Sequence, residues 1–434
     1  MGNTPIVTIH DSPTIYATFL KDGEAYTGRH LTDAGALARN GRNGVILVDG
    51  DLWREHRRFT LHVLRDFGLG KNLMQERILD EVTHTIADIK QDLKNGAKVL
   101  SIQNELDRAV GSIINLLLFG YRFGRDKLEK FEKNKQGVHK VLMHGGTFWW
   151  KIIEINVNLM KHLPHLRNVY QKVVNDNEEL GKFYLEEIEN HKKTIDFDSD
   201  QEPTDYVEAF LRHRHKLEKS GIKDHTYTDN QLFGMIFDLW LAGQETTATT
   251  LSWMCIYLIR HPECQIKMQQ ELDKFIGSDR IVTLDDKNNL NYVNAVVAET
   301  QRYCSLVPFN VPHKTTKDVE IHGYKIPSGT VITHQVGTVM ADNRYFKNPD
   351  KFDPERFLDK NGKFFSPPEL MPFGIGKRAC LGEGLARMEL YLFAANIFNQ
   401  FKLKAAYGQI PSEHRIMRGT ASCLPYQCEI ETRF

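Results

Sequence analysis

The segment Phe373–Gly382 constrains this chain more than any other, because it places a cysteine between a glycine-rich loop and a helix. It reads Phe-Gly-Ile-Gly-Lys-Arg-Ala-Cys-Leu-Gly, with the cysteine at position 380. Apolar residues then recur at positions 381, 385, 388, 392 and 395, which predicts a helix directly after the loop. Unpaired N–H groups at a helix N-terminus favour a thiolate and lower the pKa of a thiol. We therefore expect Cys380 to carry a lowered pKa.

Two interpretations of this loop are open. Glycines let a backbone approach a flat, bulky partner, and a thiolate tuned by neighbouring amides is a suitable axial ligand for haem iron. Alternatively, the loop is a glycine turn before a helix and Cys380 is an incidental core residue, since free cysteines are among the most buried residue types. Other parts of the chain have to decide between them.

Composition excludes several classes of protein. The chain has 434 residues, of which 41% are hydrophobic and 26% charged, as in ordinary globular proteins. Its 56 basic and 56 acidic residues give no net charge, which argues against a nucleic-acid binder. The six cysteines are scattered without a CxxC pair, so neither a disulfide framework nor a zinc site is predicted. No apolar run reaches the ~20 residues that span a bilayer.

The hydrophobic pattern predicts a mainly α fold with a small β portion. Helical periodicity dominates the first three hundred residues and includes a very long apolar helix at Asn230–Leu258. A further apolar helix is expected over Trp149–Leu166. Beyond Pro308, the stretches Val319–Ile326 and Val331–Val339 are predicted as strands.

The middle of the long helix is unusual. Leu241–Thr247 brings small residues, an acid and two threonines into an apolar helix, where glycine costs ~1 kcal/mol relative to alanine. Thr246 could bond a carbonyl one turn back and place its hydroxyl beside a bound small molecule. A close crossing of two helices explains the small residues equally well, and the pattern leaves both interpretations open.

Two further groups of charged residues indicate a structural or functional role only in combination with other residues. Glu299 and Arg302 share one helix face, and Arg356 could complete a buried cluster that fixes the loop leading to Cys380. Trp53 and Arg57 share another face, from which both can donate to one carboxylate. The neighbouring arginines at 54, 58 and 65 form either a solvated basic stripe or a docking surface for an acidic electron donor.

Together these motifs resemble the cytochrome P450 superfamily of haem-thiolate monooxygenases, and in particular its microsomal animal family 2 group. The motifs follow one another in the order and at the spacing of that family, so the resemblance covers the chain from end to end. It implies the P450 fold, a single catalytic domain over residues 1–434, and haem b as the cofactor. It also implies an enzyme that inserts one oxygen atom of O₂ into a lipophilic substrate: a xenobiotic, a fatty acid or eicosanoid, or a steroid-like molecule.

The resemblance assigns roles to individual residues. Cys380 corresponds to the iron ligand, and Phe373 to a residue that packs near the thiolate. Thr246 and Glu245 correspond to the residues that manage proton delivery to oxygen. Residues that correspond to anchors of the haem propionates are Trp53, Arg57, His313, Arg378 and, more loosely aligned, Arg29. Residues that correspond to the structural cluster are Glu299, Arg302 and Arg356.

Partners and location are also implied by the resemblance. Electrons would come from NADPH through a separate flavoprotein reductase, with cytochrome b5 as a further partner, and no nucleic acid is involved. The expected location is the cytosolic face of the endoplasmic reticulum membrane, with Phe148–Leu166 as a peripheral contact. Family members of this group begin with a hydrophobic anchor and first elements that this sequence lacks, so an N-terminally truncated form is expected.

Two rival functions remain. A haem-thiolate isomerase or dehydratase would act on lipid hydroperoxides without O₂ or a reductase, but such enzymes often lack the helix threonine that Thr246 supplies. A truncated, non-catalytic haem-binding product is the second rival.

Overall fold

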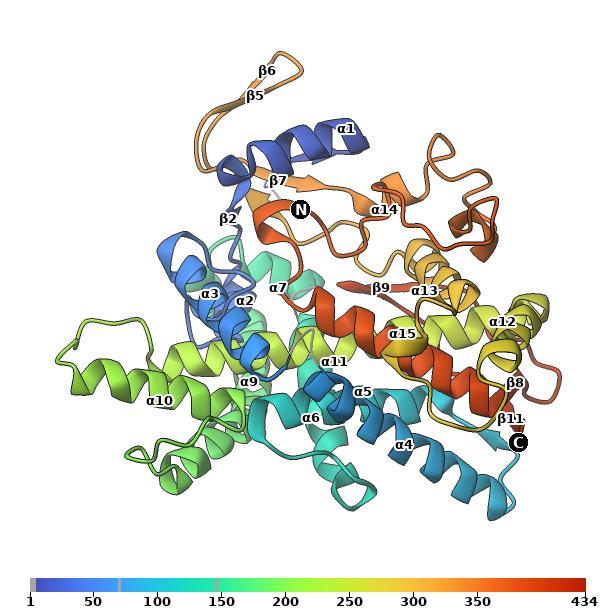
Figure 1. Cartoon of the computed structure of the whole chain (residues 1–434). Coiled ribbons are helices and arrows are strands. Elements are labelled where there is room, and N and C mark those ends of the chain that lie inside the picture. The colour runs from blue at the N-terminus through green and yellow to red at the C-terminus, as the bar shows by residue number, and fades with distance from the viewer. Residues whose placement is uncertain (1–4, 69–71, 145–146) are drawn as a thin grey trace.

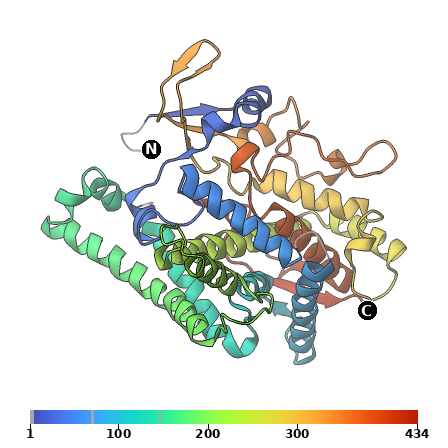
Figure 2. The same cartoon turned by 60° about the vertical axis from the view of Figure 1, so that its left-hand side comes forward.

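Helices make up most of the molecule, and short strands form small sheets around them (Figure 1). The computed structural model describes residues 5–68, 72–144 and 147–434. The longer helices are α3 (Gly50–Asp66), α4 (Asn72–Lys94), α5 (Ile102–Phe119), α6 (Leu128–His144), α9 (Pro164–Thr194), α10 (Tyr206–Lys219), α11 (Asp229–Arg260), α12 (Pro262–Phe275), α13 (Asn291–Cys304) and α15 (Glu383–Gln400). Figure 2 shows α9 as a long helix along one side of the body.

Short helical segments connect these elements. The short α-helices are α1 (Ser12–Ile15), α2 (Asp33–Leu37), α7 (Phe148–Ile153), α8 (Val157–Met160) and α14 (Val336–Met340). The π- and 3₁₀-helical turns are η1 (Tyr16–Lys21), η2 (Gly23–Tyr26), η3 (Arg125–Lys127), η4 (Leu284–Asp286), η5 (Pro354–Phe357) and η6 (Gly376–Arg378).

The strands form four small sheets. A four-stranded sheet has the order β1-β7-β4-β2, with β1 (Ile6–Ile9), β7 (Val331–His334), β4 (His313–Lys314) and β2 (Gly28–Arg29). A three-stranded sheet has the order β3-β11-β8, with β3 (Val99–Leu100), β11 (Cys428–Thr432) and β8 (Phe401–Ala405). Two strand pairs complete the set: β5 (Val319–Ile321) with β6 (Tyr324–Ile326), and β9 (Ile416–Arg418) with β10 (Thr420–Ser422). The first sheet joins distant parts of the chain, because Ile6 pairs in parallel with Val331.

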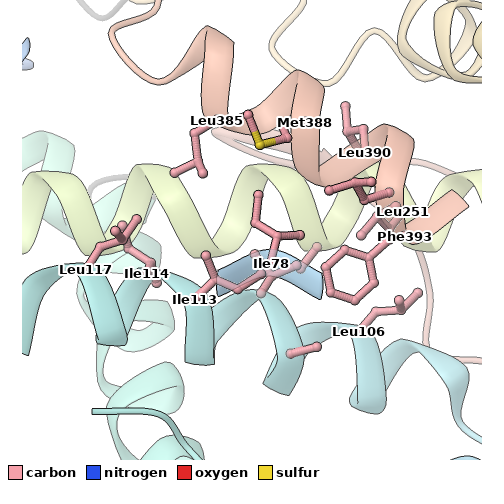
Figure 3. Packing of buried hydrophobic residues seen from close by; sticks show 14 of the residues in the cluster. Ile78, Leu106, Ile113, Ile114, Leu117, Leu251, Leu385, Met388, Leu390 and Phe393 are labelled. Atoms are coloured by element: carbon pink, nitrogen blue, oxygen red, sulfur yellow. The ribbon is translucent and has the colours of Figure 1, made fainter. Parts of the chain in front are cut away.

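The long helix α11 runs through the centre of the body. The Thr228 side chain caps its first turn by accepting a hydrogen bond from the Gln231 N–H at 3.1 Å, and α12 starts at Pro262 directly after it. Most of its residues are buried. Figure 3 shows how α5 and α15 pack on opposite sides of α11 through apolar side chains such as Ile113, Leu385 and Phe393. This core fixes the position of α15 relative to the middle of α11.

The mainly α fold with a small β portion is confirmed, but two element boundaries were predicted wrongly. Trp149–Leu166 is not one helix, because α7 ends at Ile153 and the Asn156 side chain caps a separate α8. Pro164 starts α9 at its first position instead of ending a helix. The strand expected over Val331–Val339 ends at His334, and α14 follows it.

Candidate active site

The loop around Cys380 folds back on itself. The Cys380 N–H donates to the Phe373 carbonyl at 2.9 Å, so the two ends of the loop lie together. Gly376 has a φ of +79°, and a Cβ atom there would lie 1.9 Å from the Phe19 carbonyl oxygen. Only glycine allows this close approach, which holds the loop against η1. The Phe373 ring lies 4.8 Å from the Arg387 guanidinium, on the first turns of α15.

Cys380 differs from the other cysteines of the chain. Its side chain is exposed, whereas the five other cysteines, all within the described residues, are buried. The surrounding protein nevertheless desolvates the sulfur, and this burial raises the pKa of the thiol above its ordinary value. The Gly382 N–H and the Arg57 charge act in the opposite direction but are smaller. The expected lowering of the pKa is therefore wrong for the free thiol, and a metal cation at the sulfur would supply the missing stabilisation of the thiolate.

The middle of α11 opens onto accessible space. Ala242 is exposed and Thr246 is half-buried, although residues on both sides in the helix are buried. The Thr246 hydroxyl donates to the Ala242 carbonyl at 2.6 Å, one turn back. On another face, a Cβ atom at Gly243 would lie 2.8 Å from the Ile114 side chain of α5. The small residues thus serve a close helix crossing on one face and leave accessible space on the other.

Helix α15 links the cysteine loop to this turn of α11. It starts three residues after Cys380 and packs across α11 (Figure 3). The Glu389 carboxyl of α15 hydrogen-bonds the Thr247 side chain, next to Thr246. The thiol loop and the threonine turn therefore belong to two helices in direct contact.

Three buried or half-buried arginines meet beside the cysteine loop. Arg57 Nη2 donates to the Ala379 carbonyl at 2.7 Å. Arg378 donates to the Thr27 and Val48 carbonyls at 2.9 and 2.7 Å, and its guanidinium lies 3.7 Å from the Trp53 ring. Arg29 donates through Nη1 to the Val311 carbonyl at 2.6 Å. His313 belongs to the same group, since its Nδ1 donates to the Tyr26 carbonyl at 2.6 Å.

Positive charge is in excess among the arginines beside the cysteine loop. Burial, followed by repulsion from Arg57, lowers the pKa of Arg29 to about 9. Burial, followed by repulsion from Arg29, lowers the pKa of Arg378 to about 8. Asp49 is the acid that opposes both shifts, and the buried Nε of Arg29 has no hydrogen-bond partner among the described residues. A ligand with carboxylates therefore fits this group of residues.

The Glu299 cluster joins three segments. Glu299 is fully buried, and Arg302 binds both of its oxygens at 2.7 and 2.9 Å. Arg356 Nε donates to Glu299 at 3.2 Å, and the Asp353 N–H donates to it at 2.8 Å. Arg302 also donates to the Met340 carbonyl at 2.9 Å. The cluster thus ties α13 to η5 and to the end of α14.

Glu245 is held by contacts within α11 and by charges on α5 and α6. Its carboxyl hydrogen-bonds Thr249 on the next turn of α11. Burial raises the pKa of this carboxyl, the charge of Asp107 raises it further, and the charge of Lys135 lowers it. Asp107 and Lys135 could not be predicted as neighbours of Glu245, because nothing in their local sequence distinguishes them from other charged residues on helices.

Asp238 and Glu389 were missed as well. Asp238 is fully buried in α11, where it pairs with Arg39 at 2.6 Å and accepts the Val45 and Ile46 N–H groups at 2.7 and 2.8 Å. It therefore clamps residues 39–46 to α11. A charged residue inside an otherwise apolar helical run was the available signal for both acids.

Comparison with known proteins decides the family. A family model described as Cytochrome P450 matches residues 1–423. The chain belongs to the cytochrome P450 family. Cytochrome P450 2C3 of Oryctolagus cuniculus is 34% identical over 404 residues, which cover 93% of this chain and 80% of the relative. Cytochrome P450 2C23 of Rattus norvegicus is 34% identical over 409 residues, with 93% and 79% covered. Cytochrome P450 2C70 of Mus musculus is 33% identical over 405 residues, with 93% and 80% covered.

Family membership gives the reaction class and the cofactor. This cytochrome P450 is a haem-thiolate monooxygenase that uses haem b and works with a redox partner on a lipophilic substrate. The family 2 resemblance seen in the sequence is likewise confirmed. The excess of arginine charge, the unpartnered Arg29 Nε and the exposed thiol fit a ligand that carries two carboxylates and a metal cation.

Proposed function

We propose that this cytochrome P450 inserts one oxygen atom of O₂ into a xenobiotic, a fatty acid or eicosanoid, or a steroid-like molecule. Its electrons come from NADPH through a separate flavoprotein reductase. The observation that carries the proposal is the accessible turn of α11, where the Thr246 hydroxyl and the Glu245 carboxyl lie on a helix in contact with the helix that follows Cys380. The whole chain, residues 1–434, acts as one catalytic domain.

Cys380 holds the haem iron in this proposal. The residues that would hold the haem carboxylates are Arg29, Arg57, Arg378 and His313, with the Trp53 ring stacked on Arg378. Haem with a thiolate ligand supplies the reduction of O₂ and the cleavage of the O–O bond. The Phe373 ring shields one side of the loop, since it lies against Arg387 near the start of α15.

Thr246 and Glu245 handle protons. The Thr246 hydroxyl borders accessible space and holds its hydrogen toward the Ala242 carbonyl, so a small rotation redirects it to a molecule in that space. The Glu245 carboxyl has a raised pKa because it is buried, so it carries a proton to higher pH than an exposed glutamate does. The pair can therefore supply a proton on the side of the cofactor that faces α11.

An apolar pocket with few polar anchors suits a lipophilic substrate. By resemblance to the family, the walls of this pocket come in part from Gly35–Val48, Leu306–Val311 and Ala421–Leu424. Phe309 and Leu424, in the last two segments, are 49% and 39% exposed. The Asp238 clamp holds part of the first segment against α11.

Electron donors dock on a basic face. Arg54, Arg58 and Arg65 of α3 and Lys377 of the cysteine loop are all exposed, and Glu24 pairs with both Arg54 and Lys377. This face lies over the cysteine side of the site, because Arg57 of the same helix bonds the residue before Cys380. An acidic flavoprotein reductase, and cytochrome b5 as a second donor, match this surface in charge.

The proposed location is the cytosolic face of the endoplasmic reticulum membrane. Within residues 5–68, 72–144 and 147–434, no helix has the length and apolar character needed to cross a bilayer. Large apolar side chains are exposed around α7 and α8: Phe148 at 69%, Ile155 at 65% and Leu159 at 57%. Such a patch supports peripheral contact with the membrane surface.

A carbon monoxide difference spectrum of the reduced, haem-loaded protein tests the thiolate ligand. The wild type is expected to give the thiolate-type Soret shift, and Cys380→Ser to lose it with haem still bound. Cys304→Ser, at a buried cysteine in α13, is the matched control and keeps the shift. A wild-type protein with stoichiometric haem and no such shift would refute the role of Cys380.

Turnover tests the reaction itself. In a reconstituted system with a flavoprotein reductase, a panel of lipophiles should yield monooxygenated products that depend on NADPH. Thr246→Ala is expected to keep the carbon monoxide spectrum but to release hydrogen peroxide in place of product. Conversion of lipid hydroperoxides without NADPH would support the isomerase instead, and full coupling in Thr246→Ala would refute its proton role.

A further inference from the structure

Three helices meet behind the Glu245 turn through a chain of polar side chains. Lys135 of α6 forms an ion pair with Asp107 of α5. The other oxygen of Asp107 accepts a hydrogen bond from Gln244 Nε2 of α11 at 3.4 Å. Gln244 directly precedes Glu245, so the chain ends beside the carboxyl to which proton delivery is assigned.

This chain lies almost entirely inside the protein. Gln244 is 1% exposed and the Asp107 side chain 10%, while the Lys135 side chain is 27% exposed. Buried charges of this kind are costly unless they are paired, and removing one partner leaves an uncompensated charge. The arrangement therefore has one carboxylate, Asp107, held between a cation and the turn that carries Glu245.

We propose that Asp107 and Lys135 are positioning residues for oxygen activation, which orient the Glu245 turn and set the charge that the Glu245 carboxyl experiences. The inference rests on the proposed proton role of Glu245. It extends the site from α11 to α5 and α6, two helices that the sequence motifs do not mark.

The two residues act on Glu245 with opposite sign. The negative charge of Asp107 raises the pKa of Glu245, and the positive charge of Lys135 lowers it. The other titratable group that faces both acids is the Cys423 thiol, in the segment after β10. Lys135 and Asp107 therefore balance one another, and the loss of either disturbs Glu245 in a different direction.

This opposition separates a positioning role from a merely structural one. Lys135→Met and Asp107→Asn both break the same ion pair, so a structural role predicts the same effect for both. The proposal predicts that the Glu245 carboxyl releases its proton at lower pH in Asp107→Asn. In Lys135→Met it keeps its proton to higher pH as long as Asp107 is ionised. Burial raises the pKa of Asp107 and Lys135 lowers it, so the protonation of Asp107 is followed in the same experiment.

The measurement is an infrared pH titration of the C=O stretch of protonated carboxyls in the haem-loaded protein. Glu245→Gln identifies the Glu245 band. Lys130→Met is the matched control, because Lys130 also lies on α6 and pairs with a buried acid, Glu187, at 2.6 Å but does not contact the α11 turn. Lys135→Arg retains the charge and should restore the wild-type midpoint. Shifts of the same sign in Asp107→Asn and in Lys135→Met with Asp107 ionised, or no shift in either, would overturn the proposal.

Turnover distinguishes this inference from the function on which it rests. Hydrogen peroxide formed per NADPH oxidised is measured with a flavoprotein reductase and lauric acid as the probe. The ratio should rise in Glu245→Gln and in Lys135→Met and stay at the wild-type value in Lys130→Met. If Glu245→Gln leaves the ratio unchanged, the proton role of Glu245 is wrong, and so is the positioning role of Asp107 and Lys135 that rests on it. If only Glu245→Gln raises it, the positioning role alone is wrong.

Discussion

Glu389 allows a quantitative test of the packing between α15 and α11. Its side chain is almost fully buried, at 2% residue exposure, and it hydrogen-bonds Thr247 without a cation as partner among the described residues. Burial raises the pKa of this carboxyl to about 8. In the unfolded chain a glutamate has a pKa of about 4.3, so folding holds a proton that the unfolded state releases.

The sign of the pH effect follows from this difference. Below about pH 4.3 the carboxyl is protonated in both states and does not affect stability, whereas at higher pH the unfolded state gains by ionising. The penalty grows up to the folded pKa of about 8. At about 1.36 kcal/mol per pKa unit, it amounts to roughly 1 kcal/mol at pH 5 and roughly 4 kcal/mol at pH 7.

Glu389→Gln removes this penalty and retains an amide that can bond Thr247. The variant is therefore expected to gain stability over the wild type by about 3 kcal/mol more at pH 7 than at pH 5. Urea unfolding of both haem-loaded proteins at the two pH values measures the difference. Glu186→Gln, at an exposed side chain on α9, is the control and should show no such trend. A stability difference that stays the same at both pH values would refute a protonated Glu389.

Three further substitutions test the scaffold of the site. Glu299→Gln leaves two buried guanidiniums without their carboxylate and should cost about 3–5 kcal/mol in urea unfolding, with no loss contradicting the cluster. Gly376→Ala should sharply reduce haem retention, because its Cβ would lie 1.9 Å from the Phe19 oxygen, whereas Gly362→Ala, with a similar positive φ but open space, should retain haem. Asp238→Asn should speed hydrogen exchange at the Val45 and Ile46 amides, and unchanged exchange there would argue against the clamp.

The site residues that could be predicted are those with a local signature. The Phe373–Gly382 loop combines glycines, bases and a cysteine before a helix, so its geometry follows from a few adjacent residues. The same holds for Glu299 and Arg302, which lie one turn apart on one helix. Arg356 could be added because it stands in a short, irregular segment between helix and cysteine loop. In each case a local sequence pattern marks the residues that take part in the contact.

The residues that were missed depend on contacts between distant segments. Gln244 meets Asp107 across 137 positions of sequence, and Asp238 meets Arg39 across 199. The hydrophobic periodicity of α11 does not reveal which distant residue will contact Gln244 or Asp238. The break after Ile153 was missed for a different reason, because a single Asn156 side chain caps a new helix and outweighs the apolar pattern around it.

The Cys380 thiol and the arginines beside it are each unfavourable in the protein alone, and for opposite reasons. Burial disfavours the charged form of the thiol, whereas Arg29 and Arg378 are buried with too little negative charge nearby. A ligand that brings a cation to the sulfur and carboxylates to the guanidiniums relieves both costs at once. Since such a ligand binds the folded state, haem binding stabilises the fold, and the relief of these two costs contributes to that stabilisation. The same residues that make the site specific for haem therefore also couple its binding to folding.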